Sequence, residues 1–108
     1  MAQKESEVQS AILEYLTLRG HFVLRLNNIP GFYLDAGGNK RFRKMGKYVR
    51  RGLADILIIR TGEPIFIEVK SETGKLSEEQ HAFGRDVVKA GGMYIIARSI
   101  DDVQRHGL

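Results

Sequence analysis

The chain contains no cysteine and no tryptophan, and only two prolines among its 108 residues. Without cysteine it can form neither a disulfide nor a thiolate zinc site, which fits a reducing, intracellular setting. No apolar run approaches the roughly 20 residues that a membrane-spanning helix needs. Lys4, Glu5 and Glu7 stand where a secretory signal would be apolar. We therefore expect a cytoplasmic protein without membrane contact, built as a single domain over residues 1–108.

Acidic residues are absent from one basic stretch of the sequence. Between residues 40 and 51 there are seven cations, namely Lys40, Arg41, Arg43, Lys44, Lys47, Arg50 and Arg51. The other residues, ten basic and thirteen acidic, carry net negative charge although the whole chain is at +4. Such a segment is either a solvated surface loop or an element that binds a polyanion. Phe42 and Tyr48 are interleaved with the charges, and their rings either stack on unpaired bases or pack under the loop. We favour contact with nucleic acid, because the basic stretch leads directly into the Asp55 strand.

Apolar periodicity and turn residues predict the order of the secondary structure. A helix is expected over residues 4–19, a strand over 21–26, a basic loop or ribbon over about 27–51, a hairpin with strands at 56–59 and 65–67, a helix from the cap Ser77 to about 90, a strand over 93–98, and a short last helix from Ser99. This order predicts an α/β (α+β) fold in which helices flank a central mixed sheet.

Charged residues stand at the ends of the two hairpin strands. Asp55 precedes the first strand, and Glu68 and Lys70 follow the apolar run of the second. Because side chains alternate along a strand, a loop with an even number of residues would bring Asp55 and Glu68 to one face. We expect a four-residue loop, 60–63, to place them directly opposite each other and a two-residue loop to make them diagonal neighbours.

Two neighbouring carboxylates repel each other, and both are costly to remove from water. A hard divalent cation such as Mg²⁺ would relieve both problems. The simpler alternative is that these charged groups are solvated at the strand ends. Glu7 lies at the edge of the apolar stripe of the first helix, and is either solvated or turned towards the sheet. Gln80 lies on the inward stripe of its helix, where it either binds backbone groups or belongs to the site.

These residues resemble a VRR-NUC domain, the virus-type replication and repair branch of the PD-(D/E)XK nuclease superfamily. The resemblance covers nearly the whole chain and is carried by Glu7, Gly52-Leu53-Ala54-Asp55, Glu68-Val69-Lys70 and Gly74-Lys75-Leu76-Ser77 followed by Gln80. The family usually has proline where this chain has Ala54, a change that affects the strand entry rather than the chemistry. The resemblance implies a restriction-endonuclease-like αβββαβ core, of the stand-alone type found in bacteria and phages.

The resemblance also implies a metal-dependent DNA endonuclease with assigned residues. Asp55, Glu68, the main-chain carbonyl of Val69 and Glu7 would hold one or two Mg²⁺ or Mn²⁺ ions. Lys70 would orient the attacking water or stabilise the charge on the phosphate, and Gln80 would position either of them. The seven basic residues and Lys75 would bind DNA phosphates, which positions DNA without reading its sequence.

Family members of this size resemble Holliday-junction resolvases that act as homodimers. A two-fold dimer suits a four-way DNA junction, because it presents two equivalent sites to two equivalent strands. The alternatives are a flap, single-strand or restriction-like nuclease on the same fold, or a non-catalytic DNA-binding module. An RNA substrate also stays open, since contacts to phosphates do not distinguish the sugars.

Overall fold

The structure is a computed structural model that describes residues 3–26, 31–43, 48 and 50–108. Its elements follow the chain as α1 (Glu5–Leu18), β1 (Phe22–Arg25), β2 (Gly31–Leu34), β3 (Lys40–Arg43), β4 (Ile56–Arg60), β5 (Glu63–Val69), α2 (Glu78–Lys89), β6 (Met93–Ala97) and α3 (Ile100–Gln104). The expected helices and strands are therefore present, with bounds that differ by a few residues at most. The segment expected as a basic loop or ribbon, about 27–51, contains a β-ribbon made of β2 and β3.

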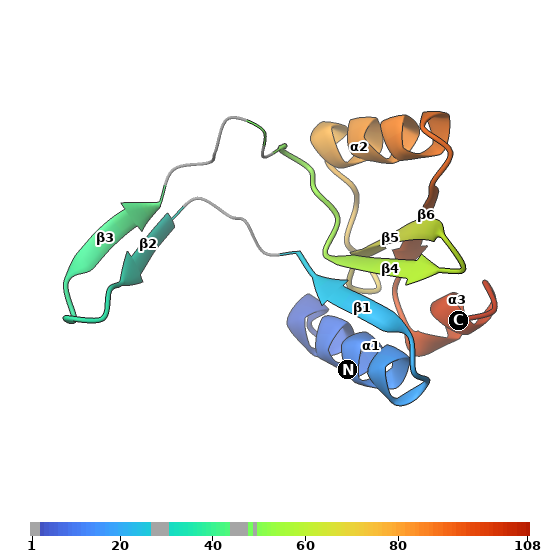
Figure 1. Cartoon of the computed structure of the whole chain (residues 1–108), viewed down its shortest axis with the longest axis horizontal. Coiled ribbons are helices and arrows are strands. Elements are labelled where there is room, and N and C mark those ends of the chain that lie inside the picture. The colour runs from blue at the N-terminus through green and yellow to red at the C-terminus, as the bar shows by residue number, and fades with distance from the viewer. Residues whose placement is uncertain (1–2, 27–30, 44–47, 49) are drawn as a thin grey trace.

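Four strands form a mixed sheet in the order β1-β4-β5-β6. β4 is antiparallel to both β1 and β5, whereas β6 runs parallel to β5 and is connected to it through α2. Without the ribbon, the order of the elements up to β6 is αβββαβ, and Figure 1 shows α2 on one side of the sheet with α1 and α3 on the other. The expected α/β (α+β) architecture, a mixed sheet flanked by helices, is confirmed.

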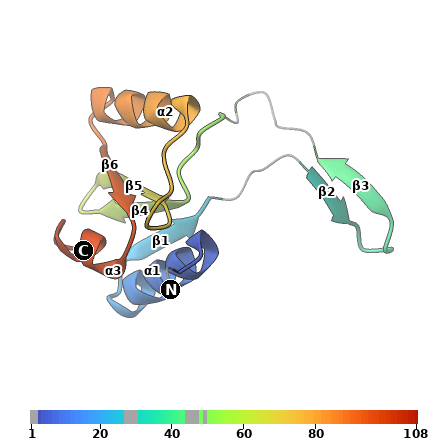
Figure 2. The ribbon, with the colours of Figure 1, turned by 180° about the vertical axis from the view of Figure 1, so that it is seen from behind.

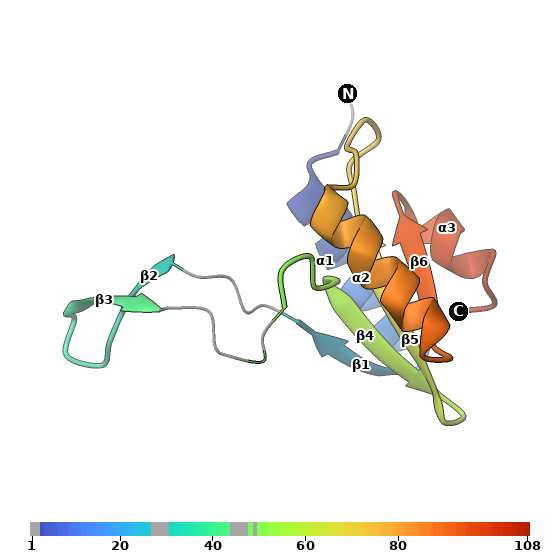
Figure 3. The ribbon, with the colours of Figure 1, turned by 90° about the horizontal axis from the view of Figure 1, so that it is seen from above.

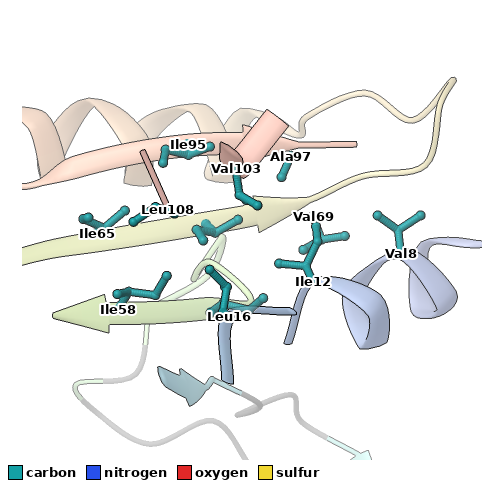
Figure 4. Packing of buried hydrophobic residues seen from close by; sticks show 12 residues of the cluster. Val8, Ile12, Leu16, Ile58, Ile65, Val69, Ile95, Ala97, Val103 and Leu108 are labelled. Atoms are coloured by element: carbon teal, nitrogen blue, oxygen red, sulfur yellow. The ribbon is translucent and has the colours of Figure 1, made fainter. Parts of the chain in front are cut away.

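The main hydrophobic core lies between the sheet and helices α1 and α3. Val8, Ile12 and Leu16 recur at helical spacing along α1, and all three are buried against the sheet. Figure 4 shows Val8 and Ile12 beside Val69 at the end of β5. The N-terminal half of α1 therefore lies next to the strand end that carries the charged residues.

The opposite face of the sheet is covered by α2. Phe83 of α2 makes edge-to-face contacts with Phe66 of β5 and Tyr94 of β6, with ring centroids 5.2 and 6.0 Å away. Since Phe66 and Glu68 alternate with the core residues of β5, Glu68 lies on this second face, underneath the start of α2. In Figure 3 the loop that enters α2 lies at the same edge of the molecule as the start of α1.

The hairpin between β4 and β5 has a two-residue loop, Thr61-Gly62, because Arg60 pairs with Glu63. Pairing Arg60 with Glu63 shortens the loop from four residues to two without changing the register, so Ile56 still pairs with Ile67. Continued by one residue, this register leads to Asp55 opposite Glu68. The diagonal arrangement expected for a two-residue loop is therefore wrong, and the same-face arrangement is right.

The β-ribbon projects away from the sheet in every view (Figures 1, 2 and 3). β2 and β3 pair antiparallel, from Gly31 opposite Arg43 to Leu34 opposite Lys40. At its tip, the Asp35 carboxylate accepts hydrogen bonds from the N–H groups of Gly37 and Asn39. A separate observation concerns membranes: no helix in the described part of the chain has the length and apolar character needed to cross a bilayer.

Candidate active site

Asp55 is tied by its backbone and its side chain to the end of β5. Its N–H donates to the carbonyl oxygen of Ile67 at 3.1 Å, and its Oδ2 accepts from the N–H of Val69 at 2.8 Å. These two bonds lie on either side of Glu68. The Asp55 carboxylate is thus held beside the Glu68 side chain by the strand pairing itself.

Glu68 is almost completely enclosed, with only 1% of its surface exposed. Its Oε1 accepts a hydrogen bond from the Gln80 amide and lies 3.9 Å from the Lys70 ammonium. Its Oε2 is buried and accepts from no N–H or hydroxyl group of the described residues, and a proton between the Asp55 and Glu68 carboxyl groups would hydrogen-bond the two side chains. Because a buried carboxylate oxygen without a donor is costly, this oxygen favours binding of a cation or a proton.

The two carboxyl groups perturb each other. Burial, followed by the negative charge of Asp55, raises the pKa of Glu68 to about 8. Burial likewise raises the pKa of Asp55, while the hydrogen bond from Val69 opposes that rise. Lys70 favours the charged form of both groups but does not outweigh burial. Such a pair binds a proton in the absence of a cation, and a divalent ion would compete with that proton.

Gln80 is held in a single orientation by the cap of α2. Its Oε1 accepts from the Ser77 N–H at 2.9 Å, and its own N–H donates to the Ser77 hydroxyl at 3.2 Å. This capping box leaves the Gln80 amide nitrogen to donate to Glu68. Both roles weighed for Gln80 are therefore combined: it binds the backbone and also contacts the site.

The segment before Asp55 is docked on the start of α2 through Gly52. A Cβ at this position would lie 2.3 Å from the Glu79 carbonyl oxygen, and Gly52 has a φ of +78°. Only glycine allows both this approach and this backbone conformation. Gly52 thus sets the spacing between the Asp55 segment and the first turn of α2, which carries Gln80.

Comparison of the chain with protein-family models, with curated proteins and with solved structures finds no match. The site is therefore interpreted from its own geometry, and the resemblance to VRR-NUC domains stays a prediction.

Helix α1 was expected to bring Glu7 either into solvent or towards the site. Glu5 and Glu7 are both exposed, and the charge of Glu5 makes a minor contribution to the raised pKa of Glu68, after burial and the charge of Asp55. Glu5 lies seven residues, or two turns, before buried Ile12, so its helical face was readable from the spacing. The described residues contain no group of three His, Cys, Asp or Glu side chains that could hold a metal. Asp55 and Glu68 therefore form a two-carboxylate site, and the roles of Glu7 and of the Val69 carbonyl as ligands stay predictions.

The basic residues fall into distinct environments. Lys40 and Arg41 are exposed on β3, where Arg41 forms an ion pair with Asp35 at 2.9 Å. Arg51 is exposed beside Gly52, and Lys75 is exposed on the loop before α2. Arg43 belongs to β3 by its backbone, while Lys44 and Lys47 lie outside the described residues. Arg50, expected to bind DNA, forms an ion pair with Asp86 at 2.7 Å and lies 5.5 Å above the Phe83 ring. These contacts dock the chain on α2 as it enters the Asp55 segment.

Proposed function

We propose that the protein is a metal-dependent endonuclease that hydrolyses phosphodiester bonds in DNA. The observation that carries this proposal is the fully buried Glu68, whose Oε2 accepts from no N–H or hydroxyl group of the described residues and which stands beside the Asp55 carboxylate. Carboxylate oxygens are the ligands that Mg²⁺ and Mn²⁺ prefer, and water molecules commonly complete their coordination. The residues present therefore fit one such ion, held by Asp55 and Glu68.

Each residue of the site has a distinct role in this proposal. The ion, when bound, supplies a water of lowered pKa and neutralises charge on the scissile phosphate. The Lys70 ammonium, next to Glu68, stabilises the negative charge that develops on the phosphate oxygens. Gln80 fixes the Glu68 carboxylate, so that its geometry does not change during the reaction. Lys75 and the exposed cations of the ribbon bind flanking phosphates.

The substrate in this proposal is branched DNA, with the four-way junction as the leading candidate. Measuring cleavage of four-way junctions, flaps, single strands and linear duplexes in Mg²⁺ or Mn²⁺ tests it. Asp55→Asn, Glu68→Gln and Lys70→Met should each lower the cleavage rate at least about 100-fold. Asp101→Asn, the same change at an exposed position in α3, should retain full activity. Junction DNA left intact by both wild type and Asp55→Asn would overturn the proposal.

The proposal includes a homodimer, because a junction has two equivalent strands to cut. Exposed apolar side chains on neighbouring strands support association with a second copy: Phe22 is 57% exposed, and its partner Ile59 is 44% exposed. Light scattering should give twice the chain mass, and Phe22→Lys should shift the protein towards the monomer. Wild type that stays monomeric at all concentrations would refute the dimer while leaving the nuclease chemistry testable.

A non-catalytic DNA-binding module is the competing outcome. Calorimetric titration with Mn²⁺ distinguishes the two, because the module predicts DNA binding without a metal signal. The nuclease predicts a binding heat that is lost in Glu68→Gln.

A further inference from the structure

Arg98 binds the backbone of the loop that joins β5 to α2. Its Nη1 donates to the carbonyl oxygens of Ser71 at 2.6 Å and Gly74 at 2.7 Å, with a longer contact of 3.4 Å to Glu72. Within the described residues, no carboxylate forms an ion pair with this guanidinium. Its charge is therefore directed at the carbonyl dipoles of one loop, which it draws together.

The backbone of Arg98 is held by α3, and the residue before it pairs with the chain that follows β5. Its N–H donates to the Asp102 carboxylate at 2.8 Å, in the first turn of α3. The preceding residue, Ala97, is fully buried and accepts a hydrogen bond from the Lys70 N–H at 3.0 Å. The side chain thus starts from a fixed point at the end of β6, immediately beside the strand that continues into Lys70.

The loop that Arg98 binds lies against the Lys70 side chain. A Cβ on Gly74 would be at van der Waals distance from Cδ of Lys70, 3.5 Å, and in closer contact with the Ser71 hydroxyl, at 3.1 Å. The Gly74 N–H donates to the Ser71 carbonyl at 3.2 Å, which makes the loop a closed turn. The loop therefore walls the Lys70 stem, and the buried position of Lys70, 9% exposed, depends on where this wall stands.

The same loop also leads to the residue that orients Gln80. After Gly74 the chain passes Lys75 and Leu76 and reaches Ser77, the cap of α2. A displacement of the loop would hence move the Lys70 wall first and the Ser77 cap second. Since a misplacement of about 1 Å can cost an enzyme about 100-fold in rate, the hold on this loop matters for chemistry.

We propose that Arg98 is a positioning residue of the active site, which keeps the Lys70 ammonium beside Glu68 by binding the carbonyls of Ser71 and Gly74. The inference rests on the proposed nuclease function and adds to it a residue that does not touch substrate or metal. Arginine suits this role better than lysine, because a planar guanidinium presents several donors in a fixed geometry.

The inference is tested by the cleavage kinetics of Arg98→Gln on the DNA substrate that wild type cleaves. We expect kcat to fall between about 10-fold and about 100-fold while KM changes less than about twofold, since only the reacting geometry is disturbed. Arg98→Lys should recover part of the loss. In a Lys70→Met background, Arg98→Gln should cause a much smaller further loss, because Arg98 acts mainly through Lys70. A loss that multiplies with that of Lys70→Met would overturn the inference.

Hydrogen exchange supplies a second readout that needs no activity. In Arg98→Gln the amide of Gly74 should exchange faster, while the buried amides of β4 and β5 keep their protection. Arg105→Gln is the matched control, because Arg105 also contacts Asp102 but is 74% exposed in its side chain and does not touch the loop. Unchanged exchange at Gly74, or an Arg98→Gln variant with full activity, refutes the positioning role alone. Wild type without nuclease activity refutes the proposed function and this inference together.

Discussion

A single side chain, Glu68, sets the energetics of the proposed site. Its burial and the neighbouring Asp55 raise its pKa from the ordinary 4.5 to about 8. The folded protein consequently binds a proton that the unfolded chain releases near pH 4.5. Binding this proton stabilises the folded state, because it removes the repulsion between two neighbouring buried carboxylates.

The raised pKa predicts how the stability of the metal-free protein changes with pH. Below about pH 4.5 Glu68 is protonated in both states, so it contributes no pH dependence. Between about 4.5 and about 8 the folded state binds more protons, and the free energy of unfolding should fall as pH rises. Urea unfolding of wild type and Glu68→Gln measures this, because the glutamine variant lacks the titrating group and serves as the reference.

As pH rises through this window, the free energy of unfolding of wild type should therefore fall relative to that of Glu68→Gln. A relative rise for wild type would contradict the assignment. Mn²⁺ added at the upper end of the window should restore stability to wild type, because an ion that binds only the folded state stabilises it by mass action. It should do little for Glu68→Gln.

Thr61 is the residue under most evident backbone strain among the described positions. It has a φ of +49° and is followed by Gly62 at +80°, the pattern of a type I′ turn. A β-branched residue is unfavourable there, whereas asparagine is favoured. Thr61→Asn should raise the free energy of unfolding by about 1 kcal/mol. Thr61→Val retains the branch and should bring no gain in the same denaturation experiment.

At the scale of elements, strand alternation and helix-capping rules predicted the features that depend only on neighbouring residues. The same-face arrangement of Asp55 and Glu68 follows from strand alternation alone, and the cap at Ser77 follows from its position before an amphipathic stretch. The buried face of α1, with Val8, Ile12 and Leu16, also follows from helical spacing. The helix pattern does not give the distance from α1 to Glu68, so the minor contribution of Glu5 to the raised pKa of Glu68 was missed.

Arg98 and Arg50 show the other limit of the sequence. Arg98 contacts backbone carbonyls whose directions depend on the loop conformation. No pattern of residues in the sequence predicts these contacts. Arg50 was grouped with the DNA-binding cations by its neighbours in sequence. Its contacts with Asp86 and Phe83 arise only because the chain passes over α2 before entering β4.

The docking of the Asp55 segment on α2 predicts different costs for two glycine substitutions. Gly52 and Gly20 have nearly equal φ values, +78° and +82°, but a Cβ on Gly20 meets nothing within 4 Å. Gly20→Ala should cost about 1 kcal/mol, from the left-handed conformation alone. Gly52→Ala adds a clash with the Glu79 carbonyl and should cost about 3 kcal/mol.

Equilibrium unfolding measures the loss of stability in both variants, and Mn²⁺ titration measures the effect on metal affinity. Gly52→Ala should also weaken Mn²⁺ binding, because it separates the Asp55 segment from the helix that carries Gln80. Equal costs for the two substitutions would show that the close approach at Gly52 is not maintained in solution.

At the scale of the whole molecule, the carboxylate site and the basic ribbon are separate structures. The sheet and its helices enclose the site, while the ribbon extends away from them with Lys40 and Arg41 exposed (Figure 2). A two-stranded ribbon on its own is only marginally stable, so binding to a surface would stabilise it. In the proposed function, this division places the chemistry in the core and the DNA affinity in the ribbon.

The division predicts that ribbon cations govern affinity and its salt dependence without changing the chemical step. Lys40→Gln and Arg41→Gln should each weaken DNA binding and lower the slope of log K against log salt by about 0.9, the value for one phosphate contact on duplex DNA. The loss should be similar for all sequences, since phosphate contacts carry no sequence information. Binding titrations over a range of salt concentrations, with Ca²⁺ in place of Mg²⁺, measure the slope. Arg19→Gln, at the far end of α1 from the site, is the control that should leave it unchanged. Single-turnover rates at saturating protein should stay near wild type in both ribbon variants, and a large fall in those rates would show that the ribbon takes part in the chemistry itself.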